Sequence, residues 1–583
     1  MKIGFTTVTF REKNLEELVE IAARSGAAGM EWGGDVHVAP GDLETARRAA
    51  ELTRQAGLEV LSYGSYYRTD DPEGEGFLPV LESAKALGVK LIRVWAGEKA
   101  PGQAEDSYRE RVAASARAIA DMAKPYGITV AFEYHRNTLT QDAGSALALL
   151  EAVGRENVKC YWQPNPDITL EENRAELAKM LPYLCCVHVF HWTGANIRHP
   201  LAEGEKDWQG YLAEIAGKGQ VNCVLEFCKD DDDSQFIADI GTLREWLLPK
   251  AVFLSTAGAE NNLERVFSPE VRGKLRQVVN LREEPILPEA LEENRAVLRE
   301  ARFAFSTWGM PSLTKEQIEE YLPKLETVFY GAGSVQMFAR PFLEQGIGVH
   351  SAWGANAVPV AEYTLAQILL ANKGFFQSVR RFKEEDRGRA ARYAGTFPGN
   401  YRVKVGILGA GMIGSLVCKL LGDYHVDILL YDPFASDEKV AGLGAVRASL
   451  EEVFEQCQTI SNHIANNPQT QGMLDYRLFS RMKPNAVFLN TGRGAQVVEA
   501  DLVRALKEGP GRTAVLDVTE PEPPVYGHEF YALPNVLLTP HIAGSSGNEV
   551  ERMGAFMAEE CRRKLAGLAC SYEVSLSMLE TMA

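Results

Sequence analysis

The sequence predicts an α/β protein with an N-terminal barrel of the (β/α)8 type and a C-terminal half built on a doubly wound parallel sheet. The chain has 583 residues, which is too long for one hydrophobic core and suggests about four domains at ~150 residues each. Apolar strand-like runs alternate with helix-like stretches over residues 1–248. A Gly-x-Gly-x-x-Gly motif follows another apolar run, VKVGIL, in the C-terminal half.

The composition narrows the classes of partner. The formal net charge is −18 and the pI is near 5.2, whereas phosphate backbones and anionic lipid surfaces attract clustered Lys and Arg. The nine cysteines show no Cys-x-x-Cys spacing, which favours reduced thiols in a cytoplasmic protein. No signal-peptide pattern follows MKIGFTTVTF, and no apolar run reaches ~18 residues. We therefore expect small-molecule ligands, with no nucleic acid and no membrane.

The first 248 residues contain eight strand-like runs separated by helix-like stretches. Several helix-like stretches end in Gly, a common C-terminal stop signal. The strand-like runs are almost continuously apolar, as parallel strands covered on both faces are. In chain order they are KIGFTTVTF, GMEWGG, LEVLSYGSYY, LIRVWAG, ITVAFEYH, VKCYWQPN, CCVHVFHW and VNCVLEF. Eight βα units over about 250 residues match the size of a (β/α)8 barrel.

Polar side chains stand near the ends of these strands, where such barrels carry their chemistry. Glu133, His188 and Glu226 lie among apolar residues, where a buried charge needs a cation or another partner. Carboxylates with an imidazole suit a divalent ion such as Mn²⁺, Mg²⁺ or Zn²⁺. The other polar residues at strand ends are Glu31, His135, Gln163, Asn165 and His191.

The segments AFEYH, YWQPN, VHVFH and VLEF resemble the xylose-isomerase-like family of sugar phosphate isomerases and epimerases. The resemblance implies a TIM barrel with one divalent ion held by Glu133, Gln163, His188 and Glu226. It also implies that Glu133 and Glu226 exchange a proton with the substrate. The family has an Asp where this chain has Gln163, whose neutral oxygen should weaken affinity for a divalent ion.

Three interpretations of this predicted site stay open. The site could carry out metal-dependent chemistry, bind a sugar without a metal, or form a structural hydrogen-bond network. His135, His191 and Arg198 are candidate contacts to a sugar or acid substrate, or supports of the site.

The C-terminal half contains a nucleotide-binding motif in VKVGILGAGMIG. Gly409 allows a tight turn, Gly411 lets the backbone approach a pyrophosphate, and Gly414 packs a helix on the strand. The helix that begins near Met412 and Ile413 would direct its N-terminus at the phosphates. Asp432 follows the next strand-like run, where its carboxylate can accept hydrogen bonds from ribose hydroxyls and would repel a 2′-phosphate. NAD is therefore the expected cofactor.

Three more segments place polar residues on the cofactor side of the same sheet. They are FLNTGRGAQV, AVLDVTEPEPP and LLTPHIAGSS, with Arg493, Glu522 and His541 after successive strands. An Arg can pair a substrate carboxylate with two hydrogen bonds. A His oriented by a carboxylate can donate a proton to a carbonyl as a hydride arrives. The pattern predicts oxidation and reduction of a hydroxy acid.

These segments, with VPVAEYTLAQILL, closely resemble the D-isomer-specific 2-hydroxyacid dehydrogenases, including phosphoglycerate dehydrogenase-like enzymes, over roughly residues 250–575. The resemblance implies a two-domain dehydrogenase with a Rossmann NAD-binding domain. Arg493 would orient the substrate acid, Glu522 and His541 would form the acid–base pair, and Asp517 would hold the nicotinamide carboxamide. The substrate carboxylate would meet backbone amides of the small domain at Gly333, Ser334 and Val335.

The same resemblance implies a domain plan and an oligomeric state. Residues 1–248 would form the barrel, residues 250–355 with 549–583 the substrate-binding small domain, and residues 356–548 the NAD-binding domain. A homo-oligomer, most simply a dimer, is expected. His463 is expected near the cofactor or in a structural role.

The leading interpretation is a bifunctional enzyme of carbohydrate metabolism. Its C-terminal half would oxidise or reduce a 2-hydroxy acid derived from a sugar, and its barrel would act as a sugar isomerase or epimerase. Two alternatives stay open. One is an active dehydrogenase fused to a non-catalytic sugar-binding barrel, and the other is an NAD-sensing binding or scaffold protein.

Overall fold

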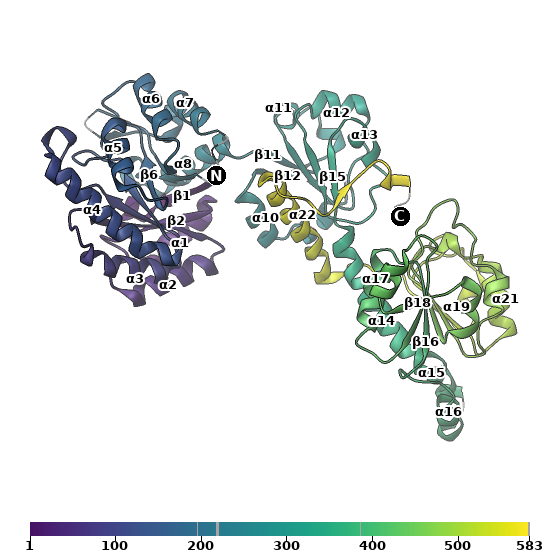
Figure 1. Ribbon diagram of the computed structural model, residues 1–583. Helices are drawn as coiled ribbons and strands as arrows, with labels where there is room; N and C mark the ends of the chain where they lie inside the picture. Colours follow the sequence, from purple (N-terminus) through teal and green to yellow (C-terminus); the bar gives the residue numbers. More distant parts are fainter. Residues whose placement is uncertain (195, 217, 219–220, 385, 581–583) are drawn as a thin grey trace. The chain divides into compact units, whose positions relative to one another are not determined.

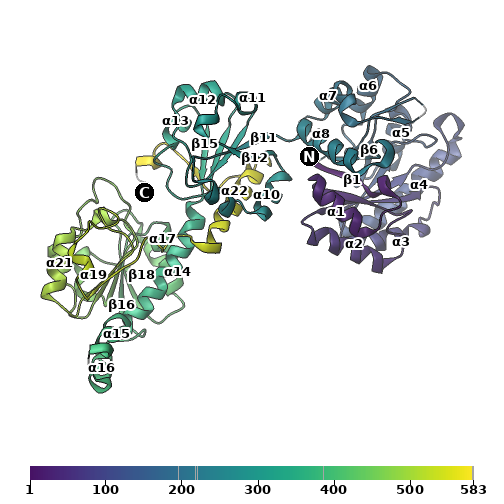
Figure 2. The ribbon, with the colours of Figure 1, turned by 180° about the vertical axis from the view of Figure 1, so that it is seen from behind.

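The computed structural model describes residues 1–194, 196–216, 218, 221–384 and 386–580. The chain divides into two compact units (Figures 1 and 2). The first contains Met1–Lys250 with Gly273–Leu281, and the second contains Ala251–Arg272 with Arg282–Ala583. The last three residues of the predicted small-domain segment, 581–583, lie outside the described residues.

The first unit contains a closed eight-stranded barrel, which confirms the predicted fold class. Every neighbouring pair of strands is parallel, and the order around the barrel is β1-β10-β7-β6-β5-β4-β3-β2. The strands are β1 (Lys2–Thr6), β2 (Gly29–Gly33), β3 (Glu59–Arg68), β4 (Leu91–Trp95), β5 (Thr129–Glu133), β6 (Val158–Trp162), β7 (Leu184–Val189) and β10 (Asn222–Leu225). A short hairpin of β8 (Trp192–Thr193) and β9 (Ile197–Arg198) follows β7.

Eight helices surround this barrel, and local sequence signals set several of their ends. The capping box of Asn14 and Glu17 begins α1, and Gly26, with φ of 77°, ends it. Thr169 and Glu172 cap α6 in the same way. The helices are α1 (Leu15–Ser25), α2 (Leu43–Gln55), α3 (Leu78–Leu87), α4 (Asp106–Ala123), α5 (Ala143–Val153), α6 (Leu170–Met180), α7 (Glu205–Ile215) and α8 (Asp233–Leu247).

The barrel has two apolar regions that support its polar end. A large core lies between the strands and the helices and includes Phe5, Trp32 and Trp162. A smaller cluster from six neighbouring strands contains Leu61, Leu91, Ala131, Tyr161, Cys186 and Val224. Because such clusters fill the interior of a barrel, the charged side chains at its polar end lie against packed apolar side chains.

The second unit contains two sheets. The first has the order β12-β11-β13-β14-β15-β23, in which β23 runs antiparallel to β15. Its strands are β11 (Lys250–Leu254), β12 (Asn280–Ile286), β13 (Phe303–Ser306), β14 (Thr327–Tyr330), β15 (Gly348–Ser351) and β23 (Glu573–Val574). The accompanying helices are α9 (Glu260–Val266), α10 (Pro269–Arg276), α11 (Arg295–Leu298), α12 (Lys315–Tyr321), α13 (Ala339–Glu344) and α22 (Val550–Leu565).

The other sheet has seven parallel strands in the order β18-β17-β16-β19-β20-β21-β22. The order reverses at β16, as in doubly wound nucleotide-binding sheets. Its strands are β16 (Lys404–Leu408), β17 (Asp427–Tyr431), β18 (Ala445–Arg447), β19 (Thr459–Asn462), β20 (Val487–Asn490), β21 (Thr513–Leu516) and β22 (Val536–Leu538). Its helices are α14 (Trp353–Asn372), α15 (Phe375–Glu384), α16 (Arg387–Ala394), α17 (Met412–Leu421), α18 (Asp437–Gly442), α19 (Leu450–Gln456), α20 (Tyr476–Phe479) and α21 (Glu499–Glu508).

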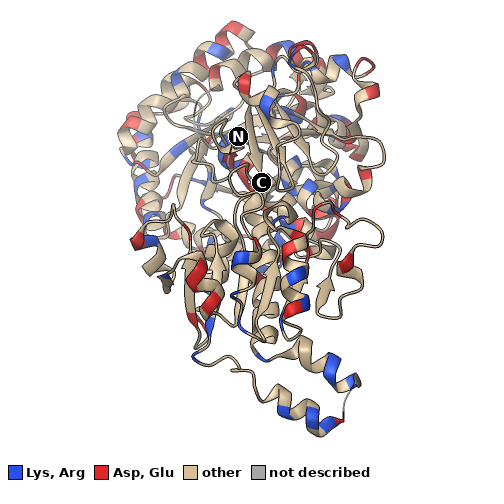
Figure 3. Ribbon diagram, turned by 90° about the vertical axis from the view of Figure 1, so that its right-hand side faces the viewer, with Lys and Arg blue, Asp and Glu red and all other residues tan. Residues whose placement is uncertain are grey.

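The charged side chains and the cysteines are arranged as the composition suggests. Figure 3 shows Lys and Arg interspersed with Asp and Glu along the outer helices. All nine cysteines are free thiols. In the part of the chain that is described, no helix combines the length and apolarity that crossing a bilayer requires.

Candidate functional sites in the barrel and in the nucleotide-binding sheet

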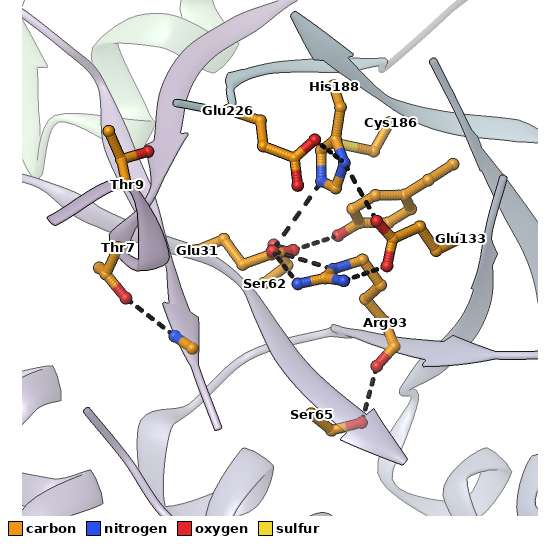
Figure 4. A network of polar contacts seen from close by, with 12 residues as sticks. Thr7, Thr9, Glu31, Ser62, Ser65, Arg93, Glu133, Cys186, His188 and Glu226 are labelled. Atoms are coloured by element: carbon orange, nitrogen blue, oxygen red, sulfur yellow. Dashed lines mark hydrogen bonds and ion pairs between the residues drawn. The ribbon is translucent and has the colours of Figure 1, made fainter. Parts of the chain in front are cut away.

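Charged side chains from several barrel strands converge on one buried network (Figure 4). Glu31 is on β2, Arg93 on β4, Glu133 ends β5, His188 is on β7 and Glu226 follows β10. The exposed fractions of these residues are 0%, 1%, 2%, 0% and 7% in that order. At such low exposure each charge must be balanced by its neighbours, since desolvation of an unpaired charge is costly.

Arg93 is the centre of one part of this network and was missed in the sequence. Figure 4 shows its guanidinium between Glu31 and Glu133. Arg93 Nε donates to Glu31 Oε1 at 3.0 Å, and Nη1 donates to Glu133 Oε2. Glu133 Oε2 also accepts a hydrogen bond from Trp95 Nε1. Burial opposes the charge of Arg93, but Glu133 and Glu31 more than compensate and raise the pKa of Arg93 well above its usual value.

Glu31 is further held by two hydroxyl groups. Ser62 Oγ donates to Glu31 Oε2 at 2.9 Å, and the Tyr161 hydroxyl donates to the same oxygen at 3.0 Å. Burial acts to raise the pKa of Glu31, but Arg93 and then His188 outweigh it and lower the pKa. Glu31 is therefore a buried carboxylate with a complete set of donors.

His188 is the centre of the other part of the network. Its Nδ1 lies 3.0 Å from Gln163 Oε1, 3.4 Å from Glu226 Oε2 and 3.6 Å from Glu133 Oε1. Burial acts to lower the pKa of His188, but Glu226 and Glu133 outweigh it and raise the pKa. Burial acts in turn to raise the pKa of Glu226, and His188 outweighs it and lowers the pKa. His188 and Glu226 thus stabilise each other in their charged forms.

The residues at this site fit a divalent ion poorly, although three of them could reach one. Glu133, His188 and Glu226 each bring one possible ligand atom within 4.8 Å of the others. Gln163 contributes only a neutral oxygen, which lies 3.0 Å from His188 Nδ1, and Glu133 Oε2 already accepts from Arg93 and Trp95. The structure thus brings Glu133, Gln163, His188 and Glu226 together as predicted, with one neutral member and with one oxygen of Glu133 already bound to protein donors.

A cavity of about 250 Å³ opens beside Gln163. Two pairs of stacked rings lie at the mouth, Trp95 with His135 at 4.4 Å between centroids and Phe190 with Trp192 at 4.2 Å. Such aromatic faces and amide groups suit a ligand with both apolar and hydroxyl-bearing faces. The lining includes Tyr134, His135, Arg136, Asn137, Gln141, Gln163, Asn165, Phe190, Trp192 and Asn196.

The other predicted contacts of the barrel divide into two groups. His135 and Asn165 line the cavity. His191 instead lies 5.3 Å from the ring of His199, and Arg198 Nη1 pairs with Asp231 Oδ1 at 2.7 Å. His191 and Arg198 are therefore not among the residues that line the cavity.

In the seven-stranded sheet, the glycines form the turn that the motif predicts. Gly409 has φ of 93°, and a Cβ there would lie 2.7 Å from His463 O. A Cβ on Gly414 would lie 2.0 Å from Gly409 O, so the helix can pack this closely only with glycine. A Cβ on Gly411 would meet nothing within 4 Å. The open space at Gly411, next to the exposed N-terminus of α17 at Met412 and Ile413, fits a pyrophosphate.

Asp432 stabilises the same turn. Its Oδ2 accepts from Ala410 N at 2.6 Å, and Oδ1 accepts from Phe434 N and Ala435 N at 2.8 and 3.0 Å. The carboxylate thus joins the glycine loop to the loop after β17. It lies where a ribose would reach it in a doubly wound sheet.

The two side chains of the predicted acid–base pair are in contact. His541 Nδ1 lies 2.7 Å from Glu522 Oε1, and the two side chains are 47% and 41% exposed. Arg493, which follows β20, is half-buried. Burial lowers the pKa of Arg493, and the charge of Glu522 partly offsets this. A carboxylate-oriented imidazole beside a cationic group is suited to proton transfer on a bound acid.

Asp517 makes several hydrogen bonds to the loop after β22. Its Oδ1 accepts from Thr539 Oγ1 at 2.6 Å and from Ile542 N at 2.8 Å, and Oδ2 accepts from Ala543 N at 2.9 Å. The backbone N–H of His541 donates to Asp517 O at 3.1 Å. Asp517 is thus the anchor of the loop that carries His541.

The predicted carboxylate-binding loop follows β14. Gly333 is half-buried, Ser334 exposed and Val335 buried. Asn356, on α14, was missed in the sequence. Its Oδ1 accepts from Ser545 N at 2.9 Å, and a Cβ on Gly333 would lie 3.8 Å from its Nδ2. An amide in the segment GANAVPVAEY was the available signal, since side-chain amides commonly hydrogen-bond to backbone groups.

His463 is a buried neutral histidine. Its Nε2 lies 2.9 Å from Ser461 Oγ, and burial lowers the pKa of His463 to about 3. Its carbonyl oxygen approaches Gly409.

The fold and these sites define a chain with two α/β parts, a parallel barrel with a polar mouth and a doubly wound nucleotide-binding sheet with a His–Glu pair. Family models match both parts. Residues 19–247 match the xylose isomerase-like TIM barrel, and residues 365–543 match the NAD binding domain of the D-isomer specific 2-hydroxyacid dehydrogenases. The fusion of these two families, recognised from the sequence motifs, is confirmed.

Individual relatives match the C-terminal half. A D-3-phosphoglycerate dehydrogenase of Archaeoglobus fulgidus is 31% identical over 238 residues, which are 41% of this chain and 44% of the relative. The same enzyme of Mycobacterium tuberculosis is 31% identical over 246 residues, 42% of this chain and 46% of the relative. The match thus spans about half the length of these relatives. Among solved structures, D-mandelate dehydrogenase of Rhodotorula graminis is 22% identical, with a TM-score of 0.47, over 56% of this chain and 97% of that chain.

Proposed function

We propose that the C-terminal half is an NAD-dependent dehydrogenase of D-2-hydroxy acids. The observation that carries this proposal is the 2.7 Å contact between His541 Nδ1 and Glu522 Oε1, in a chain whose nucleotide-binding loop is open at Gly411. The reaction is R–CO–COO⁻ + NADH + H⁺ to R–CHOH–COO⁻ + NAD⁺, in either direction.

The chain's own residues have separate tasks in this reaction. Arg493 binds the substrate carboxylate, and the amides of Gly333, Ser334 and Val335 are proposed to bind it as well. His541 donates a proton from Nε2 to the carbonyl oxygen, while Glu522 holds Nδ1 and stabilises the charged imidazole. NAD, when bound on Gly409, Gly411 and Gly414 with Asp432 at its ribose, supplies or accepts the hydride. Closure of the small domain (residues 250–355 with 549–583) on the NAD-binding domain (356–548) would exclude water.

The test is NADH oxidation by the full chain with a panel of 2-oxo acids, followed by chiral analysis of the products. We expect turnover that yields the D-hydroxy acid and that is lost in the double variant Arg493→Ala/His541→Ala. Activity surviving in the double variant would refute the assigned roles. NAD binding without turnover on any acid would favour an NAD-sensing binding or scaffold protein.

For the barrel we propose carbohydrate binding at the mouth, with isomerase or epimerase chemistry as its activity. The convergence of Glu133, His188 and Glu226 near Gln163, which lines a cavity of about 250 Å³, supports it. Together the two halves would make a bifunctional carbohydrate-metabolism enzyme. The test is the interconversion of aldose and ketose sugars by the full chain, compared with Glu226→Gln. Product formation unchanged in the variant would remove Glu226 from the reaction.

We also propose a cytoplasmic location and a homo-oligomer, most simply a dimer. The nine free thiols support the former. Light scattering of the purified chain tests the latter.

A further inference from the structure

Arg93 is a buried residue inside the barrel, beneath the mouth, and is not a surface side chain. It is 1% exposed and lies 4.8 Å from the centroid of the Tyr66 ring. Gly64 on β3 provides the space for it, since a Cβ there would lie 2.5 Å from Arg93 Nη2 and 2.8 Å from Glu31 Oε1. Strands β2, β3, β4 and β5 therefore all contribute to one fixed ion pair cluster.

His188 is the centre of the remaining polar contacts, and one of its ring nitrogens, Nε2, has no hydrogen-bond partner among the described residues. Gln163 Oε1 meets His188 Nδ1 at 3.0 Å, and the next nearest oxygen, Glu226 Oε2, lies 3.4 Å from the same nitrogen. His188 Nε2 lies 3.9 Å from Glu31 Oε1, which is too long for a hydrogen bond. The permanent positive charge of the network is therefore that of Arg93.

The charges in the network fix which ligand the mouth can accept. Three carboxylates, Glu31, Glu133 and Glu226, lie around one permanently charged side chain, Arg93, and the imidazole of His188. Of the three carboxylates, Glu226 is the most exposed, at 7% against 0% and 2%. The cation that lines the cavity, Arg136, pairs with Asp167 at 3.4 Å. A ligand that passes Gln163 and reaches the network therefore meets more carboxylates than cations, and such a site would repel a carboxylate or phosphate and accept hydroxyl donors.

We propose that Arg93 supplies the positive charge that a divalent ion supplies in related barrels, and that the mouth binds an uncharged polyhydroxylated ligand, such as a neutral sugar, without a metal. Arg93 acts through Glu133, whose carboxylate it holds, and is a positioning residue. The ligand class rests on the proposed carbohydrate function of the barrel, whereas the role of Arg93 does not.

The first experiment measures Mn²⁺ binding to the full chain by equilibrium dialysis after treatment with EDTA. We expect no stoichiometric Mn²⁺ on the wild type. Arg93→Met removes the internal cation and leaves Glu31 and Glu133 uncompensated, so it is expected to bind Mn²⁺ at least about tenfold more tightly. Arg93→Lys keeps the charge, and Arg136→Met removes a cation at the mouth that is not in the network, so both should behave as wild type.

One result overturns the proposal whether or not Arg93→Met folds. Wild-type chain that binds one Mn²⁺, and loses it in Glu133→Gln and in Glu226→Gln, would place a metal where we place Arg93. Circular dichroism of each variant separates loss of fold from loss of binding.

The second experiment tests the ligand class by saturation-transfer NMR, with D-xylose, D-fructose and D-gluconate as probes. We expect a neutral sugar to bind, and Trp192→Ala and Gln163→Leu to weaken it. Stronger binding of D-gluconate would overturn the ligand class. Binding of none of the three would refute the carbohydrate function of the barrel, while the Mn²⁺ result would still decide the role of Arg93.

Discussion

The barrel mouth and the loop after β22 both place a histidine against a carboxylate, but their surroundings differ. His188 is fully buried, with Gln163, Glu226 and Glu133 around one nitrogen. His541 is 47% exposed and has one carboxylate partner, Glu522, at 2.7 Å. The first histidine is closed off from solvent, with its polar neighbours gathered at Nδ1, whereas the second has one ring nitrogen available to a substrate.

This difference shows why a His–carboxylate pair does not define a function by itself. An exposed pair keeps a proton available for a reacting group, which general acid catalysis requires. A buried pair among further charges is part of an electrostatic network, and its geometry depends on every member. Substitutions of single residues in the barrel or in the nucleotide-binding sheet test this difference.

The largest effect is expected from His541. His541→Gln removes the proton donor and should lower kcat for 2-oxo acid reduction by about 10²–10⁴-fold. NAD binding, which uses the glycine loop, should be unchanged. Stopped-flow NADH oxidation and NADH fluorescence titration measure the two quantities. A rate within a factor of about three of wild type would show that another group donates the proton.

The next effect is on the stability of the barrel. Arg93→Met leaves Glu31 and Glu133 buried without their partner and should lower the free energy of unfolding by about 3–5 kcal/mol. Arg136→Met removes a half-exposed cation, which pairs with Asp167 at 3.4 Å, and should cost under about 0.5 kcal/mol. Urea unfolding followed by tryptophan fluorescence compares them. If both variants lowered the free energy of unfolding by the same amount, the charges of the buried cluster would not stabilise one another.

A smaller loss is expected from the glycine that makes room for this cluster. Gly64→Ala would place a Cβ 2.5 Å from Arg93 Nη2 and should cost about 1–3 kcal/mol. Gly241→Ala in α8 meets nothing within 4 Å and should be neutral or stabilising by up to about 1 kcal/mol. The same urea assay applies. A neutral Gly64→Ala would show that Arg93 can move away without penalty.

The smallest effect is the pH dependence that His463 introduces in the nucleotide-binding sheet. Its folded pKa of about 3 lies below an unfolded value of ~6.5, so the unfolded chain takes up the proton first. The free energy of unfolding should therefore fall as the pH drops below ~6.5, by about 2 kcal/mol between pH 7 and pH 5. His463→Gln should remove this pH dependence of the free energy of unfolding. His425→Gln, at an exposed position, should leave it unchanged. Identical slopes in wild type and His463→Gln would contradict the assignment.

Much of the architecture could be predicted from the sequence because it depends on local patterns. Eight apolar runs predicted the strands of the barrel. The glycine spacing, together with Asp432, predicted the turn after β16. Glu133, His188 and Glu226 could be placed at one end of the barrel, since the ends of parallel strands meet there.

The contacts within the sites could not be predicted in the same way. Arg93 lies in the middle of LIRVW, and a charge within an apolar strand was the same signal that identified Glu133. The direction of Gln163 Oε1 depends on where β7 places His188, which is a tertiary property. The carboxylate oxygens of Asp517 bind the loop of residues 539–543, and only the fold brings that loop to it. Its contact with the nicotinamide stays a prediction.

The most direct measurement compares NADH oxidation by two variants of the full chain, His541→Gln and His188→Gln, with the same 2-oxo acid. We expect the rate of NADH oxidation to fall at least about 10²-fold in His541→Gln and to stay within a factor of about two of wild type in His188→Gln. Equal rates in the two variants, or a larger loss in His188→Gln, would contradict this account.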